Sequence, residues 1–120
     1  MKNKIENLAD MESSVWGLIN GTSYHCNTFR ATVNELIELV GKPFHVDNSG
    51  QDKTTHEWAI YMLDRDEVFT IYDWKRYSPL HPDLKQEWHI GARSASTARA
   101  GVEILQELRS QAVWETDVPV

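Results

Sequence analysis

Two segments rich in aromatic and β-branched residues, 57–63 and 67–75, do most to limit how this chain can fold. The polar tripeptide at 64–66 is typical of a short hairpin loop, so we predict two antiparallel strands. Successive side chains of a strand alternate between the two faces of a sheet, and here both faces carry apolar bulk. We therefore expect a helix on one face and a partner subunit or a ligand on the other. The alternation groups one set of side chains on the second strand, at Val68, Thr70, Tyr72 and Trp74.

A capped helix is predicted at 32–40. Thr32 suits an N-cap, and Glu35 three positions later completes a capping box. Gly41 and Pro43 follow where the helix has to end. Apolar residues recur at helical spacing between these signals, at Val33, Leu36, Ile37 and Val40.

A short strand at 87–92 and a second helix are predicted toward the C-terminus. The helix begins at Ser94 or Ser96, and the tail after Trp114 is expected to fray. One apolar stripe runs along this helix, formed by Ala98, Val102, Leu105, Leu108 and Ala112.

The earlier part of the chain has weaker patterns. The run 15–19 is a short apolar strand candidate, and the Asn-Gly dipeptide after it favours a hairpin turn into a second strand at 22–26. Residues 45–55 and 76–86 have the composition of loops.

With 120 residues, the chain has the length of one domain. The order of predicted elements indicates an α+β fold, an antiparallel sheet of about five strands with two helices packed on it. We expect an N-terminal arm at 1–13, loose or forming a short helix, a single ligand-binding domain at 14–114 and a C-terminal tail at 115–120.

Acidic residues outnumber basic ones, 18 to 12, and the net charge is −6. A surface of this sign repels a phosphate backbone, so we expect no nucleic-acid polymer as a partner. A small phosphate ligand remains compatible with this charge, because a few converging Arg or Lys side chains can dominate one pocket.

Cysteine and histidine usage argues against several kinds of chemistry. Cys26 is the only cysteine, so no intrachain disulfide can form. His25 stands beside it, but neighbours on a strand point to opposite faces, so we do not expect a catalytic pair. The five histidines lack metal-ligand spacing, and we expect neither a metal nor a cofactor. The chain has no apolar run of about 18 residues and no apolar signal core at its start, so we expect a cytosolic, unprocessed protein outside the membrane.

Aromatic residues make up 10% of the chain, including five tryptophans. Three tryptophans stand beside charged or hydrogen-bonding residues. A nucleobase can stack on such a ring, and its phosphates can bind a neighbouring cation. Trp74 and Lys75 are therefore candidate ligand-binding residues, although Lys75 can equally pair with Asp73. The alternative for every tryptophan is a place in the core or in a subunit contact.

The preferred phosphate site is at His89, Gly91 and Arg93. An imidazole, an accessible backbone amide and a guanidinium would share one face there and lead into a helix N-terminus, which favours anions. The alternative is a plain helix cap. Four weaker candidates also have ordinary explanations in turn chemistry or solvation: Thr22, Ser23, Arg99 and Arg109.

Several strings, which together cover residues 19 to about 93, resemble small phage proteins of the anti-Thoeris sponge family. The more specific ones are Thr-Ile-Tyr-Asp-Trp-Lys at 70–75 and Trp-His-Ile-Gly at 88–91. The others are Ile-Asn-Gly-Thr-Ser at 19–23, the end of the capped helix at 39–43, Glu-Trp-Ala-Ile at 57–60 and Val-Phe at 68–69.

The resemblance implies a non-catalytic anti-defence protein of a phage, acting in the cytoplasm of its bacterial host. Such a protein binds the cyclic ADP-ribose isomers made by TIR-domain enzymes, and some members hold cyclic oligonucleotides too. It also implies a homo-oligomer, a dimer or a multiple of dimers, with pockets near the subunit contacts. Two other classes stay open: an acidic inhibitor that blocks a host enzyme by protein interaction, and a small nucleotide hydrolase.

Overall fold

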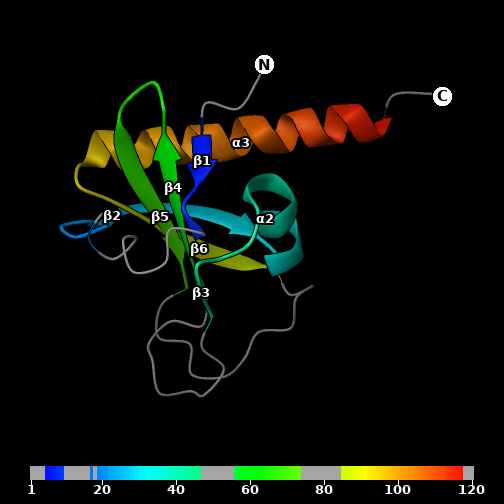
Figure 1. The fold of residues 1–120 in the computed structure, drawn as a ribbon. Helices are drawn as coiled ribbons and strands as arrows, with labels where there is room; N and C mark the ends of the chain where they lie inside the picture. Colours follow the sequence, from blue (N-terminus) through cyan, green and yellow to red (C-terminus); the bar gives the residue numbers. More distant parts are fainter. Residues whose placement is uncertain (1–4, 10–16, 18, 47–55, 74–84, 118–120) are drawn as a thin grey trace.

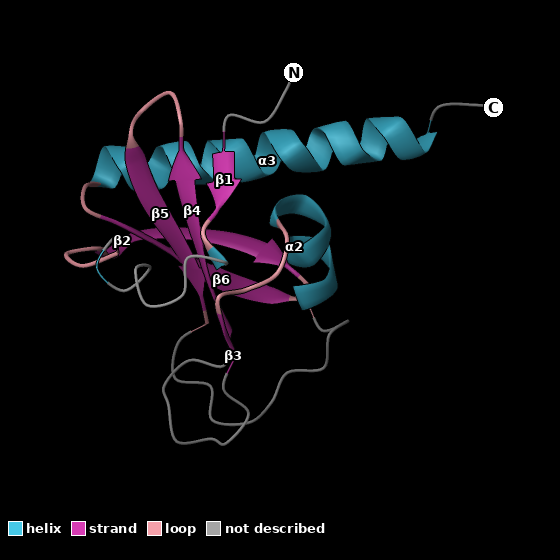
Figure 2. Cartoon of the chain, in the orientation of Figure 1, coloured by secondary structure: helices cyan, strands magenta, loops and turns pink. Residues whose placement is uncertain are grey.

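In the computed structural model of the protein, residues 5–9, 17, 19–46, 56–73 and 85–117 are described. They form an α+β fold, as predicted, with an antiparallel sheet and two helices (Figures 1 and 2). The strands are β1 Ile5–Asn7, β2 Ser23–Ala31, β3 His45–Val46, β4 His56–Met62, β5 Glu67–Tyr72 and β6 Gln86–Ala92, and the helices are α2 Val33–Val40 and α3 Ala95–Asp117.

The sheet has the strand order β1-β4-β5-β6-β2, and β3 pairs with β4 beside this path. The hairpin of β4 and β5 is confirmed, with Trp58 opposite Ile71 and Ile60 opposite Phe69. Val68, Thr70 and Tyr72 therefore lie together on the face of the sheet opposite to Phe69 and Ile71, as the alternation predicts.

Helix α2 begins and ends as the sequence predicts. Thr32 Oγ1 accepts the backbone N–H of Glu35 at 2.9 Å, and Gly41 ends the helix with a φ of 94°. Of the four apolar residues at helical spacing, Val33, Leu36 and Val40 are buried, whereas Ile37 is 42% exposed. The helix meets the core along the i, i+3 and i+7 positions, and Ile37 lies beside that line.

Some segments differ from their predictions. Ile5–Asn7 is a strand paired with β4, where a loose arm or a short helix was expected. His45–Val46 pairs with β4 inside the predicted loop at 45–55. Helix α3 continues to Asp117, past the predicted fraying point. Of the strand candidate at 15–19, the structure describes Gly17, which is helical, and Ile19, which begins a turn, so the strand is wrong at these two residues; the others lie outside the described residues.

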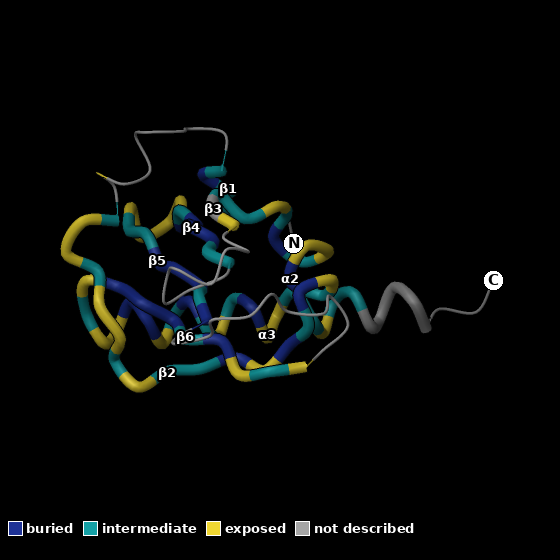
Figure 3. The backbone as a smooth tube through the Cα atoms, turned by 90° about the horizontal axis from the view of Figure 1, so that it is seen from below, coloured by how far each residue is buried: buried dark blue, intermediate teal, exposed yellow. Residues whose placement is uncertain are grey.

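Both helices pack on one face of the sheet and share one core with it (Figure 3). Trp58 and Trp88 are fully buried there, with their rings edge to face at 5.4 Å. Trp58 Nε1 donates to the Gly41 carbonyl at 2.7 Å, and Trp88 Nε1 donates to the Ala31 carbonyl at 2.9 Å. These two tryptophans are core residues, which confirms the structural alternative for them.

Helix α3 lies close against the sheet at Gly101. A Cβ atom added to Gly101 would lie 2.8 Å from Cγ of the buried Phe69. The missing side chain thus lets α3 lie directly on the Phe69 ring.

Gly101→Ala should destabilise the fold by about 1 to 3 kcal/mol, because the ring has no room to yield. This cost should exceed the gain in helix propensity, which is at most about 1 kcal/mol. Phe69→Leu added to Gly101→Ala should destabilise by less than the sum of the two single changes. Urea unfolding measures all three variants, with Ser110→Ala on the exposed side of α3 as the control. Additive losses would contradict the close packing.

Candidate functional site

The sheet face opposite α2 and α3, called the outer face below, is only partly covered by the described residues. Leu8 is buried against Ala59 on this face. Four partly buried side chains pack around these two residues: Ile19, Phe44, Tyr61 and Val68. Farther along this face, β5 and β6 present Tyr72 and His89, which are paired across the strands.

Three rings gather on the outer face, Tyr24, Tyr72 and His89, and are called the aromatic cluster below. Tyr24 stacks on His89 with ring centroids 4.3 Å apart and planes within 18°, and Tyr72 meets His89 edge-on at 5.5 Å. Tyr24 is 41% exposed, so part of its ring is open to a further planar group.

A β-bulge positions Tyr24 in this cluster. The register of β2 against β6 shifts between Tyr24 and Asn27, and Cys26 has a φ of 66°. His25 Nε2 is bound to the Ala92 carbonyl at 3.0 Å, which ties the bulge to β6. A bulge re-aims the side chains beside it, and here it sets the direction of β2 at Tyr24.

Two rings of the cluster, His89 and Tyr72, have pKa values shifted toward their neutral forms. Burial lowers the pKa of His89 below its ordinary value of 6.5, against the opposite effect of the Glu87 and Asp73 charges. Burial likewise raises the pKa of Tyr72, with smaller effects of Tyr24 and Glu57. Burial therefore favours an uncharged His89 ring beneath Tyr24.

Gly91 lies between His89 and Arg93 in the sequence and is buried. A Cβ atom there would lie 2.5 Å from Thr70 Oγ1 and 3.2 Å from Tyr72 Cε1. The glycine lets the two β5 side chains lean over β6, so its backbone contributes to the packing of this face and not to an open anion site.

His89 should make the stability of the protein depend on pH. Because its pKa is lower in the folded than in the unfolded state, the stability it contributes is complete above about pH 6.5 and declines as the pH falls below that value. His89→Phe keeps a ring in the stack and removes the titration. Urea unfolding at pH 7.5 and 5 should show a smaller loss for this variant than for the unchanged protein, and equal losses would contradict the assignment.

A cleft of about 380 Å³ lies at one end of the sheet and is called the end cleft below. The ladder between β5 and β6 covers only Thr70–Tyr72, so β5 extends past its pairing with β6. The cleft lies beside that unpaired part of β5 and is lined by Tyr61, Asp66, Glu67, Val68, Arg93 and Thr97.

Polar contacts hold the lining of the end cleft in place. Tyr61 Oη donates a short hydrogen bond to Asp66 Oδ1, and this bond is the main cause of the raised pKa of Tyr61. Glu67 Oε1 accepts from Arg65 Nε at 3.0 Å. Arg93 Nε donates to the Asn20 carbonyl at 2.9 Å, which fixes the guanidinium at the cleft.

The predicted phosphate site is only partly assembled. Strand β6 ends at Ala92, so Arg93 lies beyond it and belongs to the end cleft, while His89 belongs to the aromatic cluster. Ser94 Oγ accepts the backbone N–H of Thr97 at 3.2 Å, which is the plain helix cap that the sequence left open.

The other predicted residues are dispersed. Thr22 Oγ1 donates to the Ile19 carbonyl at 2.8 Å, and Ser23 Oγ lies 3.4 Å from His25 Nε2, so both hydroxyls have turn or bulge contacts. Arg99 is exposed on α3. Trp74 and Lys75 lie outside the described residues; Asp73 beside them is buried, and its Oδ1 accepts the backbone N–H of His56 at 3.2 Å.

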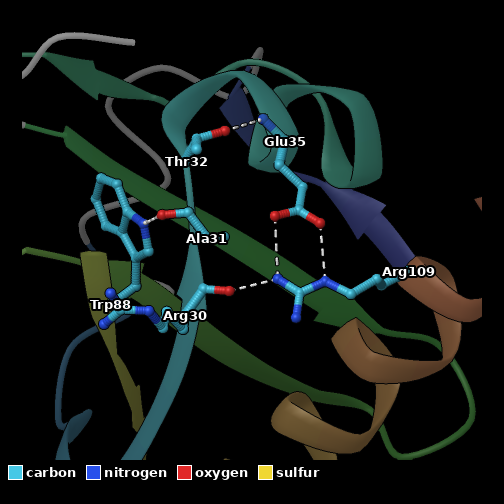
Figure 4. Close-up of polar contacts among 6 residues, drawn as sticks. All are labelled: Arg30, Ala31, Thr32, Glu35, Trp88 and Arg109. Carbon is cyan, nitrogen blue, oxygen red and sulfur yellow. Dashed lines mark hydrogen bonds and ion pairs between the residues drawn. The ribbon is translucent and has the colours of Figure 1, made fainter. Parts of the chain in front are cut away.

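Arg109 has a structural role (Figure 4). Its Nε and Nη2 donate to the two Glu35 carboxylate oxygens at 2.8 and 3.1 Å, and Nη2 also donates to the Arg30 carbonyl. The guanidinium lies 4.2 Å from the centroid of the Phe29 ring. One side chain thus connects α3, α2 and β2, so we no longer count Arg109 among the candidate ligand residues.

A double-mutant cycle with Glu35→Gln and Arg109→Met should give a coupling free energy of about 1 kcal/mol, near the upper end for partly exposed pairs. The reason is the bidentate geometry between side chains that are 32% and 30% exposed. The Arg65 and Glu67 pair, 39% exposed on each side, is the control and should couple more weakly. Urea unfolding in low and high salt measures both cycles; equal couplings would contradict this ranking.

Sequence patterns did not single out Tyr24, Tyr72, Tyr61 or Asp66 as site residues. Alternation placed Tyr72 on the outer face, but the bulge that brings Tyr24 to His89 has no local signature in β2. Asp66 lies in the predicted hairpin loop, and its positive φ of 53° is a turn feature common for Asp.

Among the described side chains, no group of three or more His, Cys, Asp or Glu could hold a metal ion. No helix in the described part of the chain has the length and apolar character that a membrane crossing requires. Comparison of the chain with protein-family models, with curated proteins and with solved structures finds no match.

Proposed function

We propose that the protein binds a small cyclic nucleotide without cleaving it and thereby keeps an immune signal from its effector. The ligands would be the cyclic ADP-ribose isomers that the resemblance to anti-Thoeris sponges implies, with cyclic oligonucleotides as a further class. The protein would act in the cytoplasm of a bacterium infected by a phage.

The observation that carries this proposal is the aromatic cluster on the outer face, with the partly exposed ring of Tyr24 stacked on His89. A nucleobase that stacks on such a ring gains about 1 to 3 kcal/mol, and an uncharged imidazole beneath it adds no repulsion. The sequence resemblance supplies the identity of the ligand, and the cluster supplies a surface suited to its base.

Arg93 is suited to the phosphates of the same ligand. It lies four residues from His89, a separation of about 13 Å at the rise of an extended strand. A dinucleotide can span this distance, with its base on Tyr24 and its pyrophosphate at the guanidinium. A charge-assisted, bidentate contact with phosphate oxygens is the interaction that arginine forms best.

Sequestration requires tight binding, because the protein acts by lowering the free concentration of the signal. A nanomolar Kd corresponds to about −12 kcal/mol and calls for a largely buried ligand. The described residues of the outer face form an open surface, with Tyr24 41% exposed, so we infer that a second copy of the chain covers the ligand. A dimer, or a multiple of dimers, would supply that cover.

The direct experiment mixes the purified protein with cyclic ADP-ribose isomers, removes free ligand, boils the complex and analyses the released molecule by mass spectrometry. Intact ligand is the expected result. Processed ligand would favour a nucleotide hydrolase, and no ligand would favour an acidic inhibitor of a host enzyme. Native mass spectrometry of the same samples counts the subunits with and without ligand.

Arg93→Ala should weaken ligand binding by about 1.5 to 3 kcal/mol, the scale of a hydrogen bond to a charged group. Lys85→Ala is the matched control, because Lys85 is exposed at the opposite end of β6 and its loss changes the net charge equally. Tyr24→Ala should also weaken binding, whereas Tyr24→Phe should retain it. Calorimetry measures affinity and thermal unfolding checks the fold; equal affinities for Arg93→Ala and Lys85→Ala would rule out this phosphate contact.

A further inference from the structure

The end cleft carries chemistry that neither a base nor a phosphate explains. Asp66, Glu67 and Arg93 line one space of about 380 Å³, together with Tyr61, Val68 and Thr97. Pockets for drug-sized molecules range from about 300 to 1,000 Å³, and this cleft lies near the lower end of that range, which suits one part of a larger ligand. Its carboxylates outnumber its guanidinium.

The two carboxylates and the one guanidinium determine which chemical group the end cleft can bind. A phosphate deep in the cleft would be repelled by Asp66 and Glu67, whereas a neutral group with several hydroxyl donors would be attracted to both carboxylates. Arg93 at the same cleft can receive the phosphate attached to such a group. A ribose joined to a phosphate has this combination of donors and charge.

The carboxylates have the capacity for these bonds. An ionised carboxylate offers about four acceptor positions. Asp66 Oδ1 accepts the Tyr61 hydroxyl, and Glu67 Oε1 accepts Arg65 Nε. These bonds orient the two carboxylates and use only part of their acceptor capacity. Acidic side chains that accept the hydroxyls of a ribose are a recurring feature of nucleotide-binding proteins.

We propose that the end cleft binds a ribose through its vicinal 2- and 3-hydroxyls, with Asp66 and Glu67 as acceptors and Arg93 at the attached phosphate. The side chains of Tyr61 and Val68 provide the apolar contacts for the carbon atoms of the sugar. This assignment rests on the proposed function, because it places a further part of the same ligand. It makes the hairpin loop between β4 and β5 the part of the protein that recognises the sugar.

The test uses a fragment that lacks a base, so that it does not depend on the aromatic cluster. Isotope-labelled protein is titrated with ribose 5-phosphate and, separately, with 2-deoxyribose 5-phosphate, and the backbone amide signals of Val68 and Thr97 are followed by NMR. The expected result is that ribose 5-phosphate shifts both signals and that the 2-deoxy sugar binds about tenfold more weakly. Equal binding of the two sugars, or no shift at the cleft, would overturn the proposal.

Asp66→Asn sharpens the test, because asparagine tolerates the positive φ at this position and keeps an oxygen for Tyr61. This variant should bind ribose 5-phosphate about tenfold more weakly, and it should lose most of the preference over the 2-deoxy sugar. Asp64→Asn, with the same charge change at an exposed position in the same hairpin, should behave like the unchanged protein. If Asp66→Asn and its control bind alike, Asp66 does not hold the sugar.

The fragment and the whole ligand separate the two proposals. If cyclic ADP-ribose isomers fail to bind but ribose 5-phosphate shows the expected preference, the sugar site stands and the proposed function fails. If the cyclic nucleotides bind while ribose and deoxyribose phosphates give equal results, the sequestering function stands and the assignment of the end cleft is wrong.

Discussion

Two indole N–H groups fix α2 on the sheet, and most of the core follows from this constraint. Trp88 donates to the carbonyl of Ala31, just before the N-cap of α2, and Trp58 donates to the carbonyl of Gly41 at its C-terminal end. A buried indole N–H without an acceptor costs about 1 to 3 kcal/mol, so each ring can be buried only where an end of α2 meets it. The length of the helix and the spacing of β4 and β6 are therefore matched.

The two faces of the sheet therefore carry different kinds of side chains. The face with both helices is filled by large apolar side chains and by the Arg109 and Glu35 pair that joins α3 to α2 (Figure 4). The outer face has a small apolar cover around Leu8 and Ala59, and beyond it the aromatic cluster. Gly91 also belongs to the outer face, where the absence of its side chain lets Thr70 and Tyr72 pack across β6.

The fold could be predicted well where one local signal determines the structure. The capping box of Thr32 and Glu35, the hairpin between β4 and β5 and the start of α3 are of this kind, because turn and cap chemistry depends on neighbours in sequence. Strand β1 could not be predicted, since three residues gain their conformation only by pairing with β4. The exposure of Ile37 could not be predicted, because helical periodicity does not reveal how wide the contact with the core is.

The candidate site was harder to predict because its parts are distant in sequence. His89 and Arg93 were predicted to share one phosphate site, but they lie in the aromatic cluster and the end cleft, with neighbours from β2, β4 and β5. Stacking of Tyr24 on His89 depends on a bulge, and the cleft depends on where the ladder of β5 and β6 stops. Such features arise from the register between strands, which no single segment encodes.

The pairing of β5 with β6 stops at Thr70, and the end cleft beside it lies apart from the core. This separation affects which substitutions the protein can accumulate. A substitution of Asp66 in the hairpin loop alters the lining of the end cleft without removing a residue of the tryptophan core. The lining of the end cleft and the tryptophan core thus come from different parts of the chain. A change at the cleft can therefore accumulate while the core residues stay under their old constraints.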